Sequence, residues 1–260
     1  MNHKAGEQNP CRQLQILDIS PMANDRFWHL RLQSPDWSWT PGQFLMLRSL
    51  SWGHDPLGAR PFSIADQNQD GLHIYMQVLG KATRSLARLS PGEEVLVWGP
   101  LGRGFHLEPE LPALLLAGGM GLAPLVGLIN HHPHPRELEL IFGHRQDLGN
   151  YPFSQLAERV LAWDVQDRTE KDLMRLQRAV EVKINGYAPD GRVLACGPEP
   201  FLRMVQSIAL QAGAQAQLCL EKYMACGIGA CLGCVVQDHQ GEHVQSCLHG
   251  PVFPAQDIRI

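Results

Sequence analysis

The sequence predicts a β-rich domain, then an α/β domain, then a small cysteine-rich lobe. Three observations carry this prediction. Apolar residues alternate with polar ones between recurrent turns early in the chain, strands alternate with helices in the middle, and cysteines cluster near the end. We place the three segments at 1–108, 109–214 and 215–260. A chain of 260 residues has room for about two domains and an appendage.

The first segment is predicted to fold as a small antiparallel β-barrel. Apolar and polar residues alternate over 72–78, which is typical of a strand with one buried face, and Val95–Trp98 indicates a second short strand. Turn dipeptides recur between such runs, at Pro41-Gly42, Asp70-Gly71 and Pro91-Gly92. Several short strands joined by regular turns favour a barrel.

The second segment begins after a linker at Glu108–Pro112 and is predicted to hold a parallel sheet. Ala113–Ala117 is a continuous apolar run, as expected of a strand buried on both faces. Glycines follow it, and then a helix from about Leu122. The further expected elements are strands at Leu138–Phe142 and Val193–Cys196 and helices at Ser154–Leu161 and Pro200–Ala212. One more strand is expected after Gln215, and the remaining residues are too few for an apolar core of their own, so a bound metal centre would stabilise them.

Composition and charge exclude several classes of function. The net charge is −4, so no electrostatic case for nucleic-acid binding arises. No apolar stretch is long enough to cross a bilayer, because glycines and Pro124 interrupt the longest one, 111–129. Residues 1–10 lack the apolar core of a secretory signal. We therefore expect a cytoplasmic protein that binds neither nucleic acid nor a membrane.

Four of the seven cysteines form a motif with the spacing C-x4-C-x2-C, followed by a last cysteine after twelve intervening residues. This is the plant-type [2Fe–2S] pattern, in which a tight loop carries three ligands and a distant segment supplies the fourth. The predicted ligands are Cys226, Cys231, Cys234 and Cys247. A structural zinc site is the alternative, but zinc usually takes two short cysteine pairs and only one is present.

Two turns in the α/β segment are candidates for nucleotide binding. Gly118–Pro124 follows a buried strand and opens a helix, so Gly119 and Gly121 would let a pyrophosphate approach backbone amides. Cys196-Gly197-Pro198 ends another strand, and ligands in open α/β sheets bind at the carboxyl ends of strands. Tight packing is the alternative for the first turn, and a plain strand-to-helix turn is the alternative for the second.

Two short segments of the first domain have the chemistry to contact a flavin nucleotide. In Arg60-Pro61-Phe62-Ser63 the guanidinium suits a phosphate, the ring suits a flavin face, and the hydroxyl suits a ring nitrogen. Gly80-Lys81-Ala82-Thr83 indicates a turn into a short helix whose amides and hydroxyls suit a phosphate. A capped helix without a ligand is the alternative for this second segment.

Together these motifs resemble those of the ferredoxin-reductase superfamily. Arg60–Ser63 is similar to the flavin motif of that superfamily, and Gly118–Pro124 is similar to its nucleotide turn. Cys196–Pro198 is similar to its nicotinamide-site motif. Its barrel strands are matched by Pro41–Phe44 and Gly99–Phe105. The cluster loop Glu221–Cys234 and the ending Gly250–Phe253 resemble more closely one subfamily, the electron-transfer subunit of type B dihydroorotate dehydrogenase.

The resemblance implies an antiparallel FAD-binding β-barrel, a Rossmann-like NAD-binding α/β domain and a C-terminal [2Fe–2S] lobe. It implies an oxidoreductase subunit that passes electrons between NAD and an FMN-containing dihydroorotate dehydrogenase catalytic subunit, in a heterotetramer that serves pyrimidine biosynthesis. By position it assigns FAD contacts to Arg60, Pro61, Phe62, Ser63, Gly80, Lys81, Ala82 and Thr83, nucleotide contacts to Gly119, Gly121, Cys196 and Gly197, and catalytic roles to Ser63 and Cys196.

The chain departs from that family pattern at several positions, and other functions remain open. Phe62 stands where the family often has tyrosine, Ala82 replaces a common glycine, and 162–186 lacks the family's glycine-rich segment. His144 and Arg145 follow a predicted strand and suit a ribose or a phosphate, without deciding between NADH and NADPH. One alternative is a reductase subunit that serves a hydrogenase or a sulfite reductase. Another, from a different class, is a non-catalytic binding module stabilised by zinc.

Overall fold

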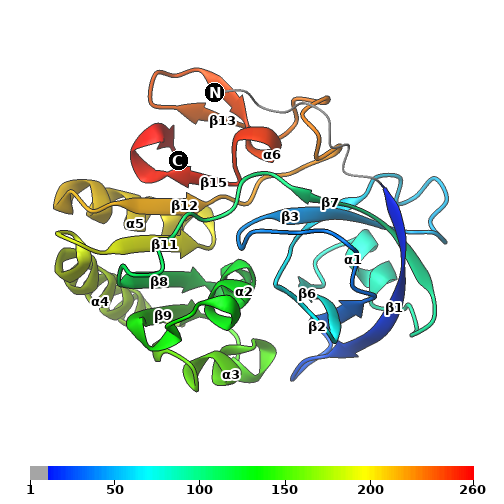
Figure 1. The fold of residues 1–260 in the computed structure, drawn as a ribbon, viewed down its shortest axis with the longest axis horizontal. Coiled ribbons are helices and arrows are strands. Elements are labelled where there is room, and N and C mark those ends of the chain that lie inside the picture. Colours follow the sequence, from blue (N-terminus) through cyan, green and yellow to red (C-terminus); the bar gives the residue numbers. More distant parts are fainter. Residues whose placement is uncertain (1–10) are drawn as a thin grey trace.

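The computed structural model describes residues 11–260 (Figure 1). The expectation about a secretory signal concerns residues 1–10 and lies outside the described residues. Within the described part of the chain, no helix is long and apolar enough to cross a membrane.

The first half of the chain forms a seven-stranded antiparallel sheet that curls into a half-barrel (Figure 1). Its strands are β1 (Arg12–Pro21), β2 (Phe27–Leu32), β3 (Phe44–Ser49), β4 (Arg60–Ser63), β5 (Asp66–Asn68), β6 (Gly71–Gln77) and β7 (Glu94–Leu101). The strand order is β4-β3-β7-β1-β2-β6-β5, so the segment with the proposed flavin motif, β4, lies at an edge. A short helix, α1 (Lys81–Leu86), follows β6, and its buried Leu86 closes the apolar interior of the half-barrel.

The second half is a six-stranded sheet in the order β10-β9-β8-β11-β12-β15, parallel except for the last strand. The strands are β8 (Ala113–Gly118), β9 (Leu138–His144), β10 (Leu161–Gln166), β11 (Arg192–Cys196), β12 (Ala216–Cys219) and β15 (Val252–Pro254). The helices are α2 (Ala123–His131), α3 (Phe153–Ala157), α4 (Glu170–Tyr187) and α5 (Glu199–Ala212). Single 3-10 turns occur at Gly119–Leu122, Pro135–Glu137, Leu148–Asn150 and Ala255–Asp257.

Alternate side chains of this sheet pack into two apolar layers. On one face, Leu114, Ile141 and Ala195 meet α4 and α5. On the other face, Leu115 and Phe142 meet α2, α3 and the half-barrel. Burial on both faces explains why the central strands are continuous apolar runs, and it places the carboxyl ends of β8 and β11 at the junction between the two halves.

The C-terminal residues contribute to two sheets. β12 and β15 extend the α/β sheet, whereas β13 (Val235–Asp238), β14 (His243–Gln245) and β16 (Ile258–Arg259) form a small sheet of their own. The cysteine loop runs between β12 and β13, and a short helix, α6 (Ser246–His249), carries Cys247. The three segments predicted from the sequence therefore stay a prediction, because strands of the third complete the sheet of the second.

The predicted fold class is confirmed, one predicted helix has the wrong end, and two elements were not predicted. The expected strands at 72–78, 113–117, 138–142 and 193–196 and the expected helix at 200–212 correspond to observed elements. The helix expected at Ser154–Leu161 ends at Ala157, because Leu161 opens β10 and pairs with Glu139 of β9. Within 162–186, which the sequence analysis left without an element, most of β10 and nearly all of α4 are found.

Polar contacts tie the half-barrel to the α/β half. Asp66 is buried, accepts a hydrogen bond from the side chain of Asn130 at 2.9 Å and shares another with His131 at 2.6 Å. Trp39 packs so closely on α2 that a Cβ on Gly127 would lie 2.2 Å from its ring. These contacts fix α2, and with it the glycine turn that precedes α2, against the half-barrel.

Candidate redox and nucleotide site

The cysteine loop folds back on itself through glycines with left-handed backbone. Gly227 and Gly229 have φ of 73° and 80°, a region that side chains other than glycine rarely adopt. The resulting turns aim amides at the sulfurs: Ile228 N lies 3.4 Å from Cys226 Sγ, and Gly229 N lies 3.1 Å from Cys247 Sγ. Cys247 N lies 3.4 Å from Cys234 Sγ. Such N–H···S contacts stabilise thiolates, which are the form that binds iron.

The four thiols affect one another's ionisation: the Cys231 thiol acts on Cys226, and the thiols of Cys234 and, more weakly, Cys226 act on Cys247. Burial opposes ionisation of Cys226, but hydrogen bonds from the amides of Ile228, Cys231 and Ala230 and from the Cys231 thiol outweigh it and lower the pKa of Cys226 to about 7. Burial and the neighbouring Cys234 raise the pKa of Cys247 to about 12. The cysteine loop thus favours the thiolate form of Cys226, whose sulfur receives the backbone amide hydrogen bonds.

Within residues 11–260, no group of three or more metal-binding side chains converges on a single point that could hold one ion. A [2Fe–2S] cluster spreads its four thiolates over two irons. Four cysteines, three on one loop and the fourth on α6, supply that number of thiolates.

An apolar cluster joins the cysteine loop to the half-barrel. It contains Met46, Leu101, Cys234 and Cys247, and it includes Ala59, the residue before the proposed flavin motif. The indole of Trp98 on β7 donates a hydrogen bond to the Cys226 carbonyl at 3.1 Å. The proposed cluster ligands and β4 therefore share one packed region of the protein.

Large apolar side chains stay exposed on the outer side of the same loop. Ile228 and Leu232 are 57% and 58% exposed, and Leu248 next to Cys247 is 47% exposed. Leu232 also has φ of 55°, an uncommon backbone conformation for a leucine. Exposed apolar groups and backbone strain gathered in one place are typical of a contact surface.

The segment Arg60–Ser63 forms β4, which pairs with β3 on one side only. All four residues are partly buried. The Arg60 guanidinium donates to the carbonyls of Gly58 and Ala59 at 2.8 and 3.0 Å, which holds it along its own strand. An edge strand with half-buried side chains leaves room for a ligand along its open side.

The segment Gly80–Thr83 forms the start of α1, as predicted. The Thr83 hydroxyl accepts hydrogen bonds from the amides of Leu79 and Gly80 at 3.0 and 3.2 Å, so the capped-helix alternative is realised in part. The Lys81 ammonium pairs with Asp55. Ala82, where the family often has glycine, is 4% exposed and fills the barrel interior. Gly80 faces open space, since a Cβ there would meet no atom within 4 Å.

The two turns of the α/β half pack directly against each other. A Cβ on Gly121 would lie 2.3 Å from the Cys196 carbonyl oxygen, so only glycine allows the turns to meet. Gly119, in contrast, has φ of 53° and faces open space, because a Cβ added there would have no atom within 4 Å. Close packing at Gly121 and open space at Gly119 suit the approach of a phosphate to the backbone of this turn. The 3-10 turn at Gly119–Leu122 also lies next to β6, so this opening faces the half-barrel.

The thiol of Cys196 lies in the interior rather than in the open space. Cys196 is 1% exposed and pairs in register with Cys219 on the neighbouring strand β12. Contact with the Cys219 thiol and burial raise the pKa of Cys196 well above its ordinary value, so the thiol is neutral. Cys196 and Gly197 therefore shape the floor beneath the glycine turn.

The carboxyl ends of β9 and β10 contain a residue that sequence analysis missed. His144 is 3% exposed and is held by Gln146 and Asp164, so it belongs to the core. Arg145 reaches Asp167 at 3.4 Å, and the second carboxylate oxygen of Asp167 is buried without a hydrogen-bond partner within residues 11–260. The place of Asp167 beside Arg145 depends on the parallel pairing of β9 with β10, which no local pattern in the sequence indicates.

Comparison with known proteins agrees with this geometry. Residues 221–259 match the family model described as the iron–sulfur cluster binding domain of dihydroorotate dehydrogenase B. Over 222 residues the chain is 33% identical to the electron transfer subunit of dihydroorotate dehydrogenase B (NAD(+)) from Caldanaerobacter subterraneus, with 84% of this chain and 86% of the relative covered. The corresponding subunit from Bacillus velezensis is 32% identical over 238 residues, with 85% and 87% covered.

Solved structures share the fold. An NADH-dependent reduced ferredoxin-NADP oxidoreductase superposes with a TM-score of 0.79 at 22% identity and covers 95% of this chain and 89% of its own. A ferredoxin NADP+ reductase from Neisseria gonorrhoeae superposes with a TM-score of 0.64 at 18% identity, with 80% and 93% covered. With relatives above 30% identity matched over most of their length, the chain belongs to the family of electron transfer subunits of dihydroorotate dehydrogenase B.

Proposed function

We propose that this chain is an oxidoreductase subunit that transfers electrons between NAD(H) and a partner dehydrogenase, with FAD and a [2Fe–2S] cluster as its bound groups. The partner is an FMN-containing subunit that oxidises dihydroorotate to orotate, and two copies of each subunit form a heterotetramer. The observation that carries the proposal is the apolar cluster in which Cys234 and Cys247 pack together with Ala59, the residue that precedes the edge strand β4.

The chain's own groups suit the cluster in number and in chemistry. Cys226, Cys231, Cys234 and Cys247 supply four thiolates. Amides of Ile228 and Gly229 stabilise the sulfurs, and burial of Cys234 and Cys247 keeps water from one side. A protein sets the reduction potential of such a cluster partly through amide contacts to the sulfurs and through burial.

Residues of the half-barrel suit FAD. Arg60, Pro61, Phe62 and Ser63 lie along the open edge of the sheet, and Gly80, Lys81, Ala82 and Thr83 begin the helix that follows β6. We assign hydrogen bonding at the flavin ring to Ser63 and phosphate binding to Arg60 and the first turn of α1. A flavin supplies the conversion between hydride transfer and single-electron transfer.

Residues at the carboxyl ends of β8 and β11 suit the nicotinamide nucleotide. Gly119 leaves open space for a phosphate, and Gly121 locks its turn against Cys196 and Gly197. The neutral Cys196 thiol places no charge beside a nicotinamide ring that must accept or release a hydride. This division assigns FAD to 1–108, NAD to 109–214 and the cluster to 215–260, in line with the three predicted segments.

The exposed apolar side chains around the cysteine loop are the proposed docking face for the partner. Ile228, Leu232 and Leu248 surround the ligands from outside. Exposed apolar groups are costly to leave in water, and covering them with a partner subunit removes that cost. Docking at this face brings the partner's cofactor to the side of the loop opposite the half-barrel.

The test is the visible spectrum of the full chain purified without oxygen, with iron, zinc and flavin assayed on the same sample. We expect about two irons and about one FAD per chain and a spectrum that NADH bleaches. Cys231→Ser should lose iron and keep flavin. A colourless protein that holds zinc and takes up no FAD on incubation contradicts the proposal and favours the zinc-stabilised binding module.

The partner is tested separately. Co-expression with a dihydroorotate dehydrogenase catalytic subunit should give a complex of both chains by size-exclusion chromatography. Leu232→Asp should dissociate it, whereas Leu210→Asp, at a position of similar exposure on α5, should not. Cofactors bound as expected but no complex with that subunit would leave the redox function standing and point to a partner of the hydrogenase or sulfite reductase kind.

A further inference from the structure

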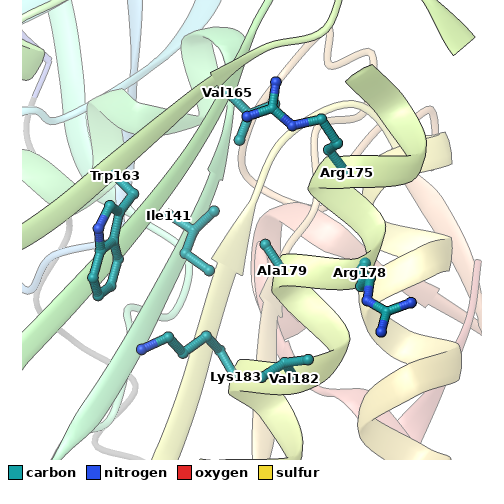
Figure 2. A pocket seen from close by; sticks show the side chains of 8 residues that line it. All are labelled: Ile141, Trp163, Val165, Arg175, Arg178, Ala179, Val182 and Lys183. Carbon is teal, nitrogen blue, oxygen red and sulfur yellow. The ribbon is translucent and has the colours of Figure 1, made fainter. Parts of the chain in front are cut away.

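We propose that a groove between β10 and α4 docks an extended acidic segment of a partner polypeptide, which adds a strand to the free edge of β10. The groove has a volume of about 430 Å³ and stands apart from the proposed redox site. Figure 2 shows its walls: the Trp163 indole on one side, α4 on the other, and Ile141 between them.

The edge of the sheet at this groove is open. β10 pairs only with β9 among the described residues. Its groove-facing side chains are apolar, and Leu161 and Trp163 are 53% and 42% exposed. The charged residue of the strand, Asp164, points to the other face, where it contacts His144 at 3.1 Å. Natural edge strands are usually blunted by lysine, proline or an inward charge, and β10 has none of these on its groove face.

The helix presents a second stripe to the groove. Leu176, Val180 and Ile184 form the buried stripe that packs on the sheet. The groove stripe contains Arg175, Arg178, Ala179, Val182 and Lys183, at the spacing of three and four residues that marks one helix face. Val182 is 61% exposed, so this stripe is apolar in the middle and lacks cover.

The groove is positively charged at the end formed by Arg175 and Arg178, and the other end holds an ion pair. In Figure 2 the Arg175 side chain reaches over Val165 at one end, and Lys183 points toward Trp163 at the other. The Lys183 ammonium lies 4.4 Å from the centre of the Trp163 ring and 2.6 Å from Glu139. Within residues 11–260, Arg175 and Arg178 form no ion pair or hydrogen bond. Unpaired guanidiniums beside an apolar floor favour a carboxylate-bearing partner.

The spacing of groove residues along α4 matches an extended chain. Arg175 and Ala179 are four residues apart on α4, which is roughly 6 Å along the helix axis. Positions i and i+2 of a strand share a face and lie about 7 Å apart. The occupant therefore carries an acidic side chain at i, beside Arg175, and an apolar one at i+2, above Ala179 and Trp163.

Two other occupants fit less well. If two copies of this chain paired through β10 about a two-fold axis, both sets of cations would lie on the same face of the joined sheet and repel. A small anion would leave Trp163 and Val182 in water, whereas an added strand covers both and satisfies the free backbone groups of β10.

The groove is built almost entirely from one segment of the chain. All its lining residues except Ile141 fall within 162–186, the segment that departs from the family pattern. β10 is the edge of the sheet opposite β15, which adjoins the cluster lobe (Figure 1). The acidic segment and the redox partner can therefore bind at the same time.

The test selects a displayed library of random heptapeptides on the full chain, and each selected peptide is then measured on the double variant Arg175→Glu/Arg178→Glu. We expect enrichment of an acidic-x-apolar pattern. A synthetic peptide of that pattern should slow hydrogen exchange of the β10 amides. The double variant should weaken its binding about tenfold, the size expected of two exposed ion pairs. The matched control is Lys171→Glu/Arg136→Glu, which changes the net charge equally outside the groove and should bind normally.

Three results would overturn the proposal. Selection without this pattern, or peptides that bind the double variant equally well, would remove the cationic groove from recognition. Binding that protects α4 but not β10 would exclude strand addition. Dimerisation of the chain with protection of β10 would make a second copy the occupant.

Discussion

At the scale of single residues, we predict that Asp167 favours NADH over NADPH at the proposed nucleotide site. It follows β10, and one of its carboxylate oxygens is buried without a partner within residues 11–260. A carboxylate there accepts hydrogen bonds from a ribose diol and repels a 2′-phosphate. Asp167→Ser should reduce the preference for NADH over NADPH by roughly tenfold to a hundredfold, as expected for loss of a charged hydrogen bond. The measurement is the ratio of kcat/KM values for the two nucleotides.

Asp190→Ser is the matched control, since Asp190 lies on an exposed loop and should leave the ratio unchanged. An unchanged ratio in Asp167→Ser would exclude Asp167 from ribose recognition and leave the nucleotide preference to other residues.

Two glycines of the α/β half make opposite predictions for the same substitution. Gly121→Ala should destabilise the protein by about 1–3 kcal/mol, because the new Cβ would overlap the Cys196 carbonyl and push the two turns apart. Gly186→Ala, inside α4 with no atom within 4 Å of the added Cβ, should stabilise by about 0.5–1 kcal/mol. Denaturant unfolding measures both. If both variants changed stability in the same direction, the tight contact between the turns would be wrong.

Spacing alone carries the prediction of the cluster ligands. The four cysteines were predicted from their separation, because one short loop and one distant ligand suffice to describe the site. The burial of Cys196 against Cys219 depends on how β11 and β12 align, which no local pattern encodes. The role of Asp167 likewise could not be predicted from a local pattern, because its position matters only once β9 and β10 lie side by side.

At the scale of elements, β7 and the cysteine loop are joined by one hydrogen bond from Trp98. Trp98→Phe keeps the ring and removes the N–H that holds the Cys226 carbonyl. Loss of this bond should weaken the loop by about 1 kcal/mol, so iron should leave to a chelator several times faster. The measurement is the rate of iron loss at fixed chelator concentration, together with the potential of the bound cluster.

Trp28→Phe serves as the control for the loss of an indole N–H. Its N–H donates to the Asp25 carbonyl at 2.7 Å on the exposed side of β2, away from the cysteine loop. Equal rates of iron loss from both variants would show that Trp98 does not position the loop.

The helix α4 shows what a sequence pattern can and cannot supply. Thr169 and Asp172 form a reciprocal cap at its start, with hydrogen bonds of 3.2 and 3.1 Å, and apolar residues recur along one face after it. That signal is local and was available in the sequence. The end of α3 was not, because Leu161 leaves the helical pattern only to pair with Glu139 on β9.

At the scale of the whole molecule, a chain of hydrogen bonds runs from the half-barrel into α2. His29 contacts His73 at 3.0 Å, His73 contacts Asn68 at 3.3 Å, and Asn68 donates to Asp66 at 3.3 Å. Asp66 then meets His131 at 2.6 Å. The two halves that would hold FAD and NAD are thus joined through a network of polar side chains that includes His29, His73 and His131.

This network predicts a pH dependence of global stability. Burial, and after it the charge of His73, lowers the pKa of His29 to about 4, and burial also lowers the pKa of His73. An unfolded histidine titrates near 6.5, so between these values the unfolded chain binds more protons than the folded one. The free energy of unfolding should therefore fall as the pH drops from about 6.5 toward 4, by at most roughly 1.4 kcal/mol per pH unit for each histidine.

The measurement is the denaturant midpoint at about pH 7 and about pH 5 at constant ionic strength, a window in which histidines dominate the titration. His29→Phe keeps the ring that stacks on Tyr75 and removes the titrating group, so its midpoint should fall less than that of the parent chain. His106→Phe is the control, because that side chain is 85% exposed and its variant should follow the parent. An equal fall in all three proteins would mean that the buried pair of histidines does not couple protonation to the joining of the two halves.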